Sequence, residues 1–267
     1  MSADPFAPLR ERALRSDGVL GALACSEDGT VLYEERADET FPAASVIKIP
    51  LVMALYADAA AGRVSLDERV AVGERAYGSG ILGRLGDVGP LSLRDLAMLT
   101  IAVSDNTATN MLIDRVGADR VNERMREWGC ERSVLGRKMF EKRQGRENLL
   151  TPRETASLLL RLARGECADR ATSDAVIALL RECQDETRLE RYLPAGTDVA
   201  HKSGWIEGVR NDAGIVRVTR TVVAAGFVRE LRAPEQAAPL LGLLGWCAYR
   251  AAGGDGSPLP FELSGLT

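Results

Sequence analysis

The chain has 267 residues, of which 46% are hydrophobic and 27% are charged, and its 38 acidic and 34 basic residues give a formal net charge of −4. This composition is typical of a soluble globular protein that is long enough to bury a large core in one or two domains. The balanced charge lacks the basic excess of nucleic-acid-binding and membrane-surface proteins, so we expect neither partner.

The N-terminal residues lack the marks of a secreted protein. The first 18 residues, "MSADPFAPLRERALRSDG", are charged and contain no apolar signal-peptide core, and the sequence has no apolar run long enough to cross a membrane. We therefore expect a cytoplasmic protein if this sequence is complete. Five scattered cysteines without a C-x-x-C pair are typical of reduced thiols in packing positions.

The chain has a single histidine, His201, which removes several kinds of catalytic site. A zinc site built on several histidines is excluded, and no G-x-S-x-G motif is present to form a Ser-His-Asp triad with it. We expect His201 to orient strand packing beside Lys202. We also expect neither a metal nor a cofactor.

The first third of the chain predicts a helix, a hairpin and a second helix. Residues 6–16 have an amphipathic helical pattern, and residues 18–36 read as two strands around the turn "EDGT". A helix follows over residues 45–61, and because it is apolar nearly all round we expect it to be buried. Pro50 lies just inside this helix and predicts a local distortion.

The middle of the chain predicts helices and the last third predicts strands. "SLRDL" from Ser92 and "TPRE" from Thr151 are strong helix-start signals, and Gly117 is a typical helix end. The expected helices in this part cover residues 92–104, 106–117, 118–129, 151–165 and 169–183. The expected strands cover residues 197–206, 211–218 and 220–231, and a helix over 233–253 follows them.

Two early and three late strands, separated by a block of helices, predict an α+β fold. We expect a three-layer α/β/α sandwich with a five-stranded antiparallel sheet flanked by helices, plus an all-helical subdomain. The sheet domain would comprise residues 1–61 and 191–267, and the helical subdomain residues 62–190. The active site would lie in the cleft between them.

Ser45 and Lys48 form the first candidate catalytic motif, S-x-x-K, inside the apolar stretch "FPAASVIKIPLVMALYA". Of the 34 basic residues only four are lysine, so a lysine here is unusual. Residues three apart share one face of a helix. A desolvated lysine can lose its proton, as arginine does not, and can then activate a serine hydroxyl that is otherwise a poor nucleophile.

Two further motifs follow in order: "SDN" at Ser104–Asn106 and "KSG" at Lys202–Gly204. Each could arise as an ordinary helix start or strand, but the three together are not accidental. "GSGILG" at residues 78–83 matches a nucleotide-binding pattern, but no helix follows it, so we interpret it as a loop. Tyr77 beside it either lines the cleft mouth or is a simple loop aromatic.

The ordered set S-x-x-K, S-D-N and K-[ST]-G resembles that of class A β-lactamases and penicillin-binding proteins. The resemblance covers nearly the whole chain and implies an antiparallel sheet with an all-helical subdomain and the active site between them. It implies that Ser45 is the acylated nucleophile, that Lys48 accepts or relays its proton, and that Ser104 passes a proton to the leaving nitrogen.

The resemblance also implies the substrate-binding residues. Asn106 would bind the substrate and hold Lys48, and Lys202 and Ser203 would bind the substrate carboxylate. The backbone amides of Ser45 and Trp205 would form the oxyanion hole. Together with Gly204 of the motif and Tyr77, these complete the predicted site.

The sequence departs from class A β-lactamases before Thr151. Those enzymes hydrolyse the acyl-enzyme with a water activated by a glutamate in an E-x-x-L-N motif of an omega loop. Here the region reads "SVLGRKMFEKRQGRENLLTPRE", which lacks that motif and is shorter. Glu141 and Glu147 are the available carboxylates, and each is either a water-activating base or a solvated loop charge.

The resemblance therefore implies a serine acyl-enzyme hydrolase that opens β-lactam or related amide bonds through Ser45, a hydrolase linked to β-lactam breakdown and antibiotic resistance. The alternatives are a D-alanyl peptidase, esterase or amidase on the same fold, and a non-enzymatic ligand-binding descendant. The expected partner is a small molecule: a β-lactam, a small amide or an ester.

Overall fold

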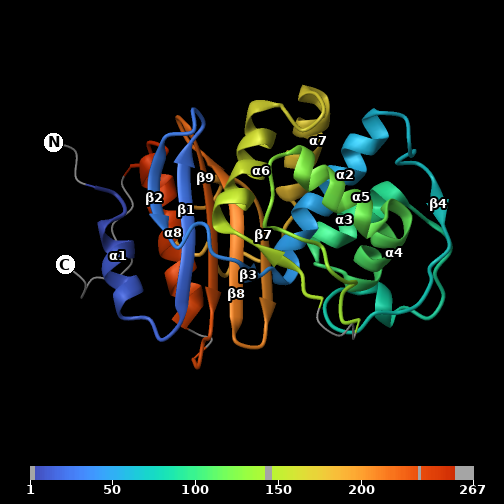
Figure 1. Ribbon diagram of the computed structural model, residues 1–267, viewed down its shortest axis with the longest axis horizontal. Helices are drawn as coiled ribbons and strands as arrows, with labels where there is room; N and C mark the ends of the chain where they lie inside the picture. The colour runs from blue at the N-terminus through green and yellow to red at the C-terminus, as the bar shows by residue number, and fades with distance from the viewer. Residues whose placement is uncertain (1–3, 142–145, 234–235, 256–267) are drawn as a thin grey trace.

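The computed structural model describes residues 4–141, 146–233 and 236–255. Within these residues, one antiparallel sheet has the strand order β2-β1-β9-β8-β7 (Figure 1). The predicted five-stranded antiparallel sheet is therefore confirmed. Its strands are β1 (Val19–Ser26), β2 (Val31–Glu35), β7 (Asp198–Ile206), β8 (Val209–Arg217) and β9 (Thr221–Arg229).

Helices cover both faces of this sheet, as the alternation of buried side chains along β1 requires. Leu20 and Ala22 pack against α1 (Ala7–Leu14) and α8 (Ala237–Ala251) on one face. Leu23 points to the other face, which α6 (Pro152–Arg164) covers through contacts with β1, β8 and β9. The predicted three-layer α/β/α sandwich is therefore present.

The remaining helices gather at the right of Figure 1, around α2 (Lys48–Ala60). Every residue of α2 from Lys48 to Asp58 is buried, because neighbouring helices contact it on all sides. The predicted burial of this apolar helix is confirmed. The surrounding helices are α3 (Leu93–Ala102), α4 (Asn106–Val116), α5 (Ala118–Glu127) and α7 (Arg170–Leu180).

Two helices pack differently from the predicted division at residues 62 and 190. The predicted helical block contains α6, but one strongly apolar face of α6 lies on the sheet. The predicted sheet segment contains α2, but α2 is the centre of the helical group. Packing of apolar faces, rather than chain order, decides these positions. The domain boundaries themselves stay a prediction.

Several short elements escaped the sequence analysis, because two-residue strands and single turns carry no periodicity. β3 (Phe41–Pro42) pairs with β6 (Leu149–Leu150), and β4 (Arg69–Val70) pairs with β5 (Leu91–Ser92). The structure also contains the 3₁₀ turns η1 (Ala44–Ile47) and η2 (Leu82–Arg84). η1 shows that the predicted single helix from Ser45 is wrong in its first turn.

The predicted helix starts have clear physical forms, whereas Pro50 is accommodated inside a regular helix. Ser92 and Thr151 accept hydrogen bonds from the third amide of the helices that they begin. Pro50 lies in the first turn of α2, where its missing N–H has no intrahelical partner to lose. α2 runs through Pro50 without interruption, so the predicted distortion at Pro50 is not observed; the 3₁₀ turn η1 lies before α2.

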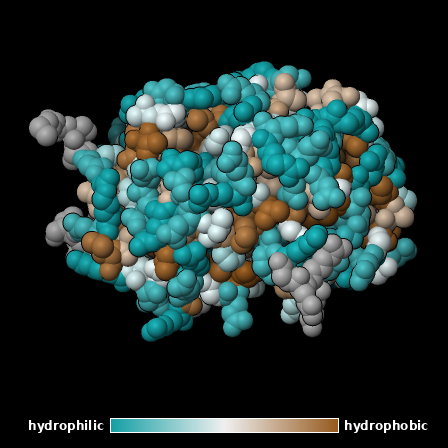
Figure 2. All heavy atoms as spheres, in the orientation of Figure 1, coloured by the Kyte–Doolittle hydropathy of each residue, from teal (hydrophilic) through white to brown (hydrophobic). Residues whose placement is uncertain are grey.

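No helix in the described ranges is long and apolar enough to cross a membrane. On the face drawn in Figure 2, hydrophobic residues form small separate patches among hydrophilic ones. The core lies inside the three layers and around α2.

Candidate active site

Ser45 lies in η1, the turn that joins β3 to α2. Side chains three residues apart are eclipsed in a 3₁₀ helix, so Ser45 and Lys48 still share one face. Ala44, just before the serine, has a φ of +45°, a left-handed conformation that strains a residue with a Cβ. The backbone at the candidate nucleophile is therefore held in place by its surroundings.

Lys48 is fully buried, and its ammonium is held by the S-D-N motif. Its Nζ donates to the carbonyl of Ser104 at 2.9 Å, to Ser104 Oγ at 3.0 Å and to Asn106 Oδ1 at 2.9 Å. Burial and the nearby charge of Lys202 hold the pKa of Lys48 well below its ordinary value. The lowered pKa makes it easier for Lys48 to lose a proton, and the resulting amine can accept one.

Ser104 occupies a strained turn between α3 and α4. Its φ of +53° is in the left-handed region. The Ser79 hydroxyl donates to its carbonyl at 2.9 Å, the same carbonyl that accepts from Lys48. These bonds fix the Ser104 side chain beside the Lys48 ammonium, which a proton relay between the two requires.

Asp105, the middle residue of the motif, ties the glycine-rich loop to α4. One carboxylate oxygen caps α4 by accepting from Ala108 N at 2.9 Å. The other accepts from the amides of Ile81 and Leu82, both at 2.7 Å. A Cβ on Gly80 would lie 2.3 Å from this carboxylate. Only glycine therefore lets the loop backbone come this close to Asp105. The "GSGILG" stretch is the predicted loop and packs against the site.

Asn106 links Lys48 to the wall of the site. While its Oδ1 accepts from Lys48, its Nδ2 donates to the carbonyl of Tyr77 at 3.0 Å. A Cβ on Gly78 would lie 2.8 Å from that Nδ2. The amide is therefore fixed in orientation, and it positions the segment that carries Tyr77.

The K-S-G motif lies on β7, which packs directly against η1. Lys202 is buried and donates to the Ser203 carbonyl at 2.9 Å, and burial lowers its pKa. A Cβ on Gly204 would lie 2.7 Å from the backbone nitrogen of Ser45. This contact brings the backbone at Trp205 next to Ser45, which the predicted pair of oxyanion-hole amides requires.

Two residues beside the K-S-G motif were missed by the sequence analysis. The Ser203 hydroxyl donates to Asp185 Oδ2 at 2.8 Å, and Arg188 Nη1 contacts the same oxygen. Arg188 is almost fully buried. No motif marks these residues, because they lie on the segment between α7 and β7 and reach the strand only through the fold.

A cavity of about 780 Å³ opens beside Ser45. Among the predicted site residues, Ser45, Tyr77, Asn106, Trp205 and the candidate carboxylate Glu147 line it. Lys48, Lys202 and Ser203 are buried behind it. The other lining residues come mainly from the glycine-rich loop and from the segment before α6: Pro42, Ala44, Ala76, Gly78, Ser79, Gly80, Gly83, Arg84, Arg137, Met139, Phe140, Asn148, Ile206 and Glu207.

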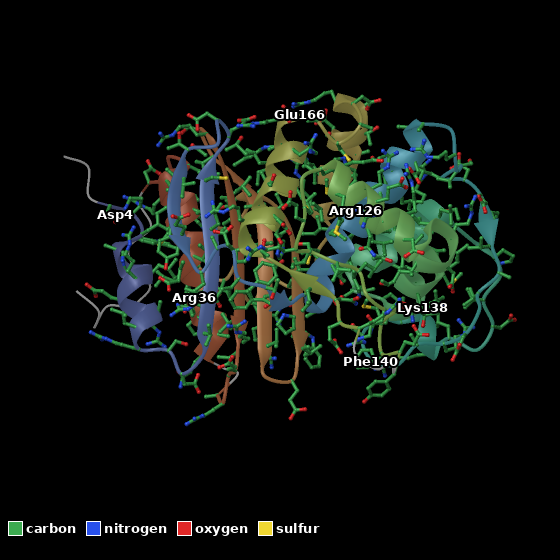
Figure 3. The ribbon with its side chains drawn as sticks, viewed as in Figure 1. Asp4, Arg36, Arg126, Lys138, Phe140 and Glu166 are labelled. Carbon is green, nitrogen blue, oxygen red and sulfur yellow. The ribbon has the colours of Figure 1, made fainter. Side chains whose placement is uncertain are left out.

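Aromatic side chains stand on both sides of the cavity. Tyr77 packs edge-on against Phe140, with 5.4 Å between ring centroids. Phe140 has a φ of +59° and lies at the lower edge of the helical part in Figure 3. Trp205 is exposed opposite them, and the guanidinium of Arg210 lies over its ring at 5.5 Å. Tyr77 therefore lines the cavity, which is the first of the two roles that the sequence allowed for it.

The two candidate water-activating carboxylates have different positions. Glu147 lines the cavity, and its Oε2 accepts from Arg137 Nη2 at 2.9 Å. Glu141 is half-buried and is not among the cavity-lining residues. Asn148 Oδ1 accepts from the amides of Gly136 and Arg137 at 2.9 and 3.0 Å, which ties the residue after Glu147 to the segment before Glu141.

His201 is buried next to Lys202 on β7 and faces away from the cavity-lining set. Its Nδ1 lies 2.9 Å from Asp212 Oδ1, and its Nε2 lies 3.2 Å from Glu190 Oε1. Burial opposes protonation, but the charge and hydrogen bond of Asp212 outweigh it and raise the pKa of His201 well above its ordinary value. These contacts fit the predicted packing role.

Comparison with known proteins identifies relatives over most of the chain. Residues 12–252 match the model of the β-lactamase enzyme family. A β-lactamase of Rhodobacter capsulatus is 32% identical over 145 residues, which cover 51% of this chain and only about half, 49%, of that protein. The extended-spectrum β-lactamase PER-1 of Pseudomonas aeruginosa is 24% identical over 72% of this chain and 68% of its own length.

Solved structures share the whole fold. A β-lactamase from Sphaerobacter thermophilus is 34% identical, with a TM-score of 0.87 over 93% of this chain and 98% of that one. PBP-A is 29% identical, with a TM-score of 0.84 over 94% of this chain and 96% of its own. The resemblance that the three motifs predicted is therefore confirmed at the level of family and fold.

Proposed function

The chain belongs to the β-lactamase enzyme family, and from this we propose that it is a serine acyl-enzyme hydrolase that opens β-lactam or related amide bonds through Ser45. One observation carries the proposal: a fully buried lysine with a lowered pKa shares a turn face with Ser45 and is bonded to Ser104 and Asn106. The arrangement places a group that can accept a proton beside Ser45 and a hydroxyl that can pass it on.

In the proposed acylation, neutral Lys48 takes the proton of Ser45 Oγ as that oxygen attacks the substrate carbonyl carbon. The oxyanion is stabilised by the backbone amides of Ser45 and Trp205. The C–N bond then breaks, and the leaving nitrogen receives a proton through Ser104, which lies 3.0 Å from Lys48 Nζ. The products of this step are an ester on Ser45 and a free amine.

The comparisons support acylation by a β-lactam. The curated relatives that match are named β-lactamases. A point mutant of PBP-A was solved as an acyl-enzyme complex with penicillin G. That protein shares 29% of aligned residues with this chain, so a penicillin is a rational first probe for Ser45.

For hydrolysis of the ester we propose Glu147 as the residue that activates water, because it lines the cavity that contains Ser45. Its carboxylate forms an ion pair with Arg137 Nη2 at 2.9 Å, which holds the side chain at the cavity wall. Glu141 is the second candidate. We therefore expect Glu147→Gln to lengthen the lifetime of the acyl-enzyme more than Glu141→Gln.

The second candidate function is a D-alanyl peptidase, esterase or amidase on the same fold. The observation that favours it is the shortened segment before α6, which lacks the E-x-x-L-N motif. If deacylation of a β-lactam is slow for this reason, a penicillin would act as an inhibitor and a small ester or peptide as the substrate. A non-enzymatic descendant is the least favoured reading, because all three motifs that acylation needs are present and meet in the structure.

Intact-mass spectrometry tests these functions. Wild type and Ser45→Ala are mixed with a penicillin and a cephalosporin and followed over time. A Ser45-dependent mass increase that decays with product release supports a β-lactamase, and an adduct that persists supports the second candidate. Full turnover by Ser45→Ala would overturn the mechanism, and Ser45-dependent turnover of any substrate would remove the non-enzymatic reading.

A further inference from the structure

We propose that Asp185 is a specificity-determining residue, whose carboxylate occupies the subsite where Ser203 and Arg188 would otherwise receive a carboxylate of the substrate. The site then disfavours substrates that carry a carboxylate at this end, and favours those that are neutral there. The inference rests on the proposed function, because it concerns which substrates reach Ser45.

Two donors converge on a single oxygen of Asp185. The Ser203 hydroxyl donates to Oδ2 at 2.8 Å, and Arg188 Nη1 donates to the same Oδ2. A hydroxyl and a guanidinium aimed at one point form a carboxylate-binding arrangement. In this structure the chain supplies that carboxylate from its own segment between α7 and β7.

The other carboxylate oxygen holds Asp185 in this place. Oδ1 accepts from the Thr187 hydroxyl at 2.6 Å and from the Thr187 amide at 3.2 Å. Both oxygens of Asp185 are therefore bonded, one to its own loop and one to the K-S-G motif. An external carboxylate would have to break the contacts of Oδ2 to gain the same donors.

The burial of the three side chains puts Asp185 on the outer side of this subsite. Ser203 is 4% exposed, and the side chain of Arg188 is 8% exposed, whereas that of Asp185 is 29% exposed. None of the three lines the cavity beside Ser45, and Ser203 is next to it through its neighbour Gly204, which contacts the Ser45 backbone. The donors are thus covered, and the carboxylate of Asp185 is the more accessible group.

Charge adds to this competition. Burial acts to raise the pKa of Asp185, but the charge of Arg188 and the bonds from Thr187 and Ser203 outweigh it and lower the pKa to about 2. Asp185 is ionised at neutral pH, so a substrate carboxylate in contact with it meets a like charge. Rejection through a built-in repulsive group is a common source of specificity.

The test compares two substrates that differ only in this charge: benzylpenicillin and its methyl ester. The second-order rate constant for acylation of Ser45 is measured by intact mass for wild type and Asp185→Asn. The asparagine keeps the size and can still accept from Ser203. We expect the constant for benzylpenicillin to rise about tenfold or more, as removal of a like charge predicts, and that for the ester to change less than about twofold.

Asp198→Asn is the matched control. It removes one negative charge at the start of β7 and breaks an ion pair with Arg181, without touching the K-S-G motif. Asp185→Glu restores the charge and should restore discrimination against benzylpenicillin, which a merely structural role would not predict. Asp185→Ala replaces Asp185→Asn if the latter melts at a lower temperature than wild type.

Equal acceleration of both substrates, a loss for both, or an equal effect of Asp198→Asn would overturn the inference while leaving the proposed function intact. If neither compound acylates Ser45 in wild type or in Asp185→Asn, the proposed function fails and this inference fails with it. The ratio of the two rate constants, rather than either alone, is the deciding quantity.

Discussion

Gly204 and Ser45 are in direct contact: a Cβ on Gly204 would lie 2.7 Å from the backbone nitrogen of Ser45 and 3.0 Å from that of Val46. The strand that carries K-S-G and the turn that carries the nucleophile therefore meet with no space for a side chain. This contact sets the distance between the two amides of the proposed oxyanion hole.

Gly204→Ala should reduce acylation of Ser45, because the new methyl group must push η1 away from β7. Loss of one oxyanion donor costs about 10²–10³ in rate, and we expect a decrease of that order. The rate constant for acylation by benzylpenicillin gives the measurement. Gly73→Ala, with open space around its Cβ, is the control and should be neutral. An unchanged rate in Gly204→Ala would contradict the proposed hole.

Acylation should increase with pH through the lowered pKa of Lys48. Below that pKa the amine is protonated and cannot accept the Ser45 proton, and above it the amine is neutral. The rate should thus reach its plateau well below 10.5, the ordinary lysine value. Lys48→Arg stays protonated and should lose about 10²–10⁴ in rate at every pH. A pH–rate profile of both proteins checks this, and a flat wild-type profile would speak against Lys48 as the base.

Asp105→Ala should destabilise the protein more than an ordinary helix-cap variant. It removes the cap of α4 and leaves the amides of Ile81 and Leu82 without their acceptor, so we expect a loss of about 2–4 kcal/mol in free energy of unfolding. Asp169→Ala removes only the cap of α7 and should cost about 1 kcal/mol. Urea unfolding measures both, and equal losses would show that the loop contact adds nothing.

His201 should be protonated in the folded protein well above pH 6.5, because the adjacent Asp212 outweighs the effect of burial. The folded pKa is the higher one, so the stability from this pair is complete below pH 6.5 and is lost as pH rises through the folded pKa. The single histidine makes its NMR titration unambiguous. The stability gap between wild type and His201→Gln should shrink over the same pH range, and a folded pKa below 6.5 would refute the expectation.

Phe140→Ala should weaken recognition of aromatic acyl groups. The ring packs edge-on against Tyr77 on the cavity wall, so its loss removes apolar surface on one side of the cavity. We expect the acylation rate constant for benzylpenicillin to fall about fivefold, as loss of an aromatic contact of about 1 kcal/mol predicts. 6-Aminopenicillanic acid, which lacks the aromatic group, should be unaffected. An equal fall for both would indicate a general structural effect.

Much of the fold could be predicted from the sequence, because it depends on patterns within single elements. The turn "EDGT" predicted the hairpin of β1 and β2, and the apolar character of α2 nearly all round predicted a buried helix. The helix starts at Ser92 and Thr151 could be predicted, because an N-cap bonds to an amide only three residues further along the chain. β3 and β6 were not, since their pairing brings together residues about a hundred positions apart.

The site was predictable only in part, for the same physical reason. Ser45 and Lys48 are one turn apart, so their shared face could be inferred. The bond of Lys48 to Asn106 followed from a family resemblance rather than from spacing, and its bonds to Ser104 were found only in the structure. Asp185 has no motif, because its role comes from a hydrogen bond to Ser203 on a different segment. The packing of α6 on the sheet likewise depends on which apolar surface is free in the folded chain.

Three residues around the cavity, Ala44, Ser104 and Phe140, have left-handed backbone conformations although none is glycine. Each such residue costs of order 1–3 kcal/mol. Selection for heat resistance and selection for turnover therefore act in opposite directions at these positions. A glycine at residue 44 would relax the turn and favour the folded state, while giving the nucleophile more freedom to leave its attacking position. Backbone strain at these three residues thus exchanges some stability of the folded protein for a fixed position of the reacting groups.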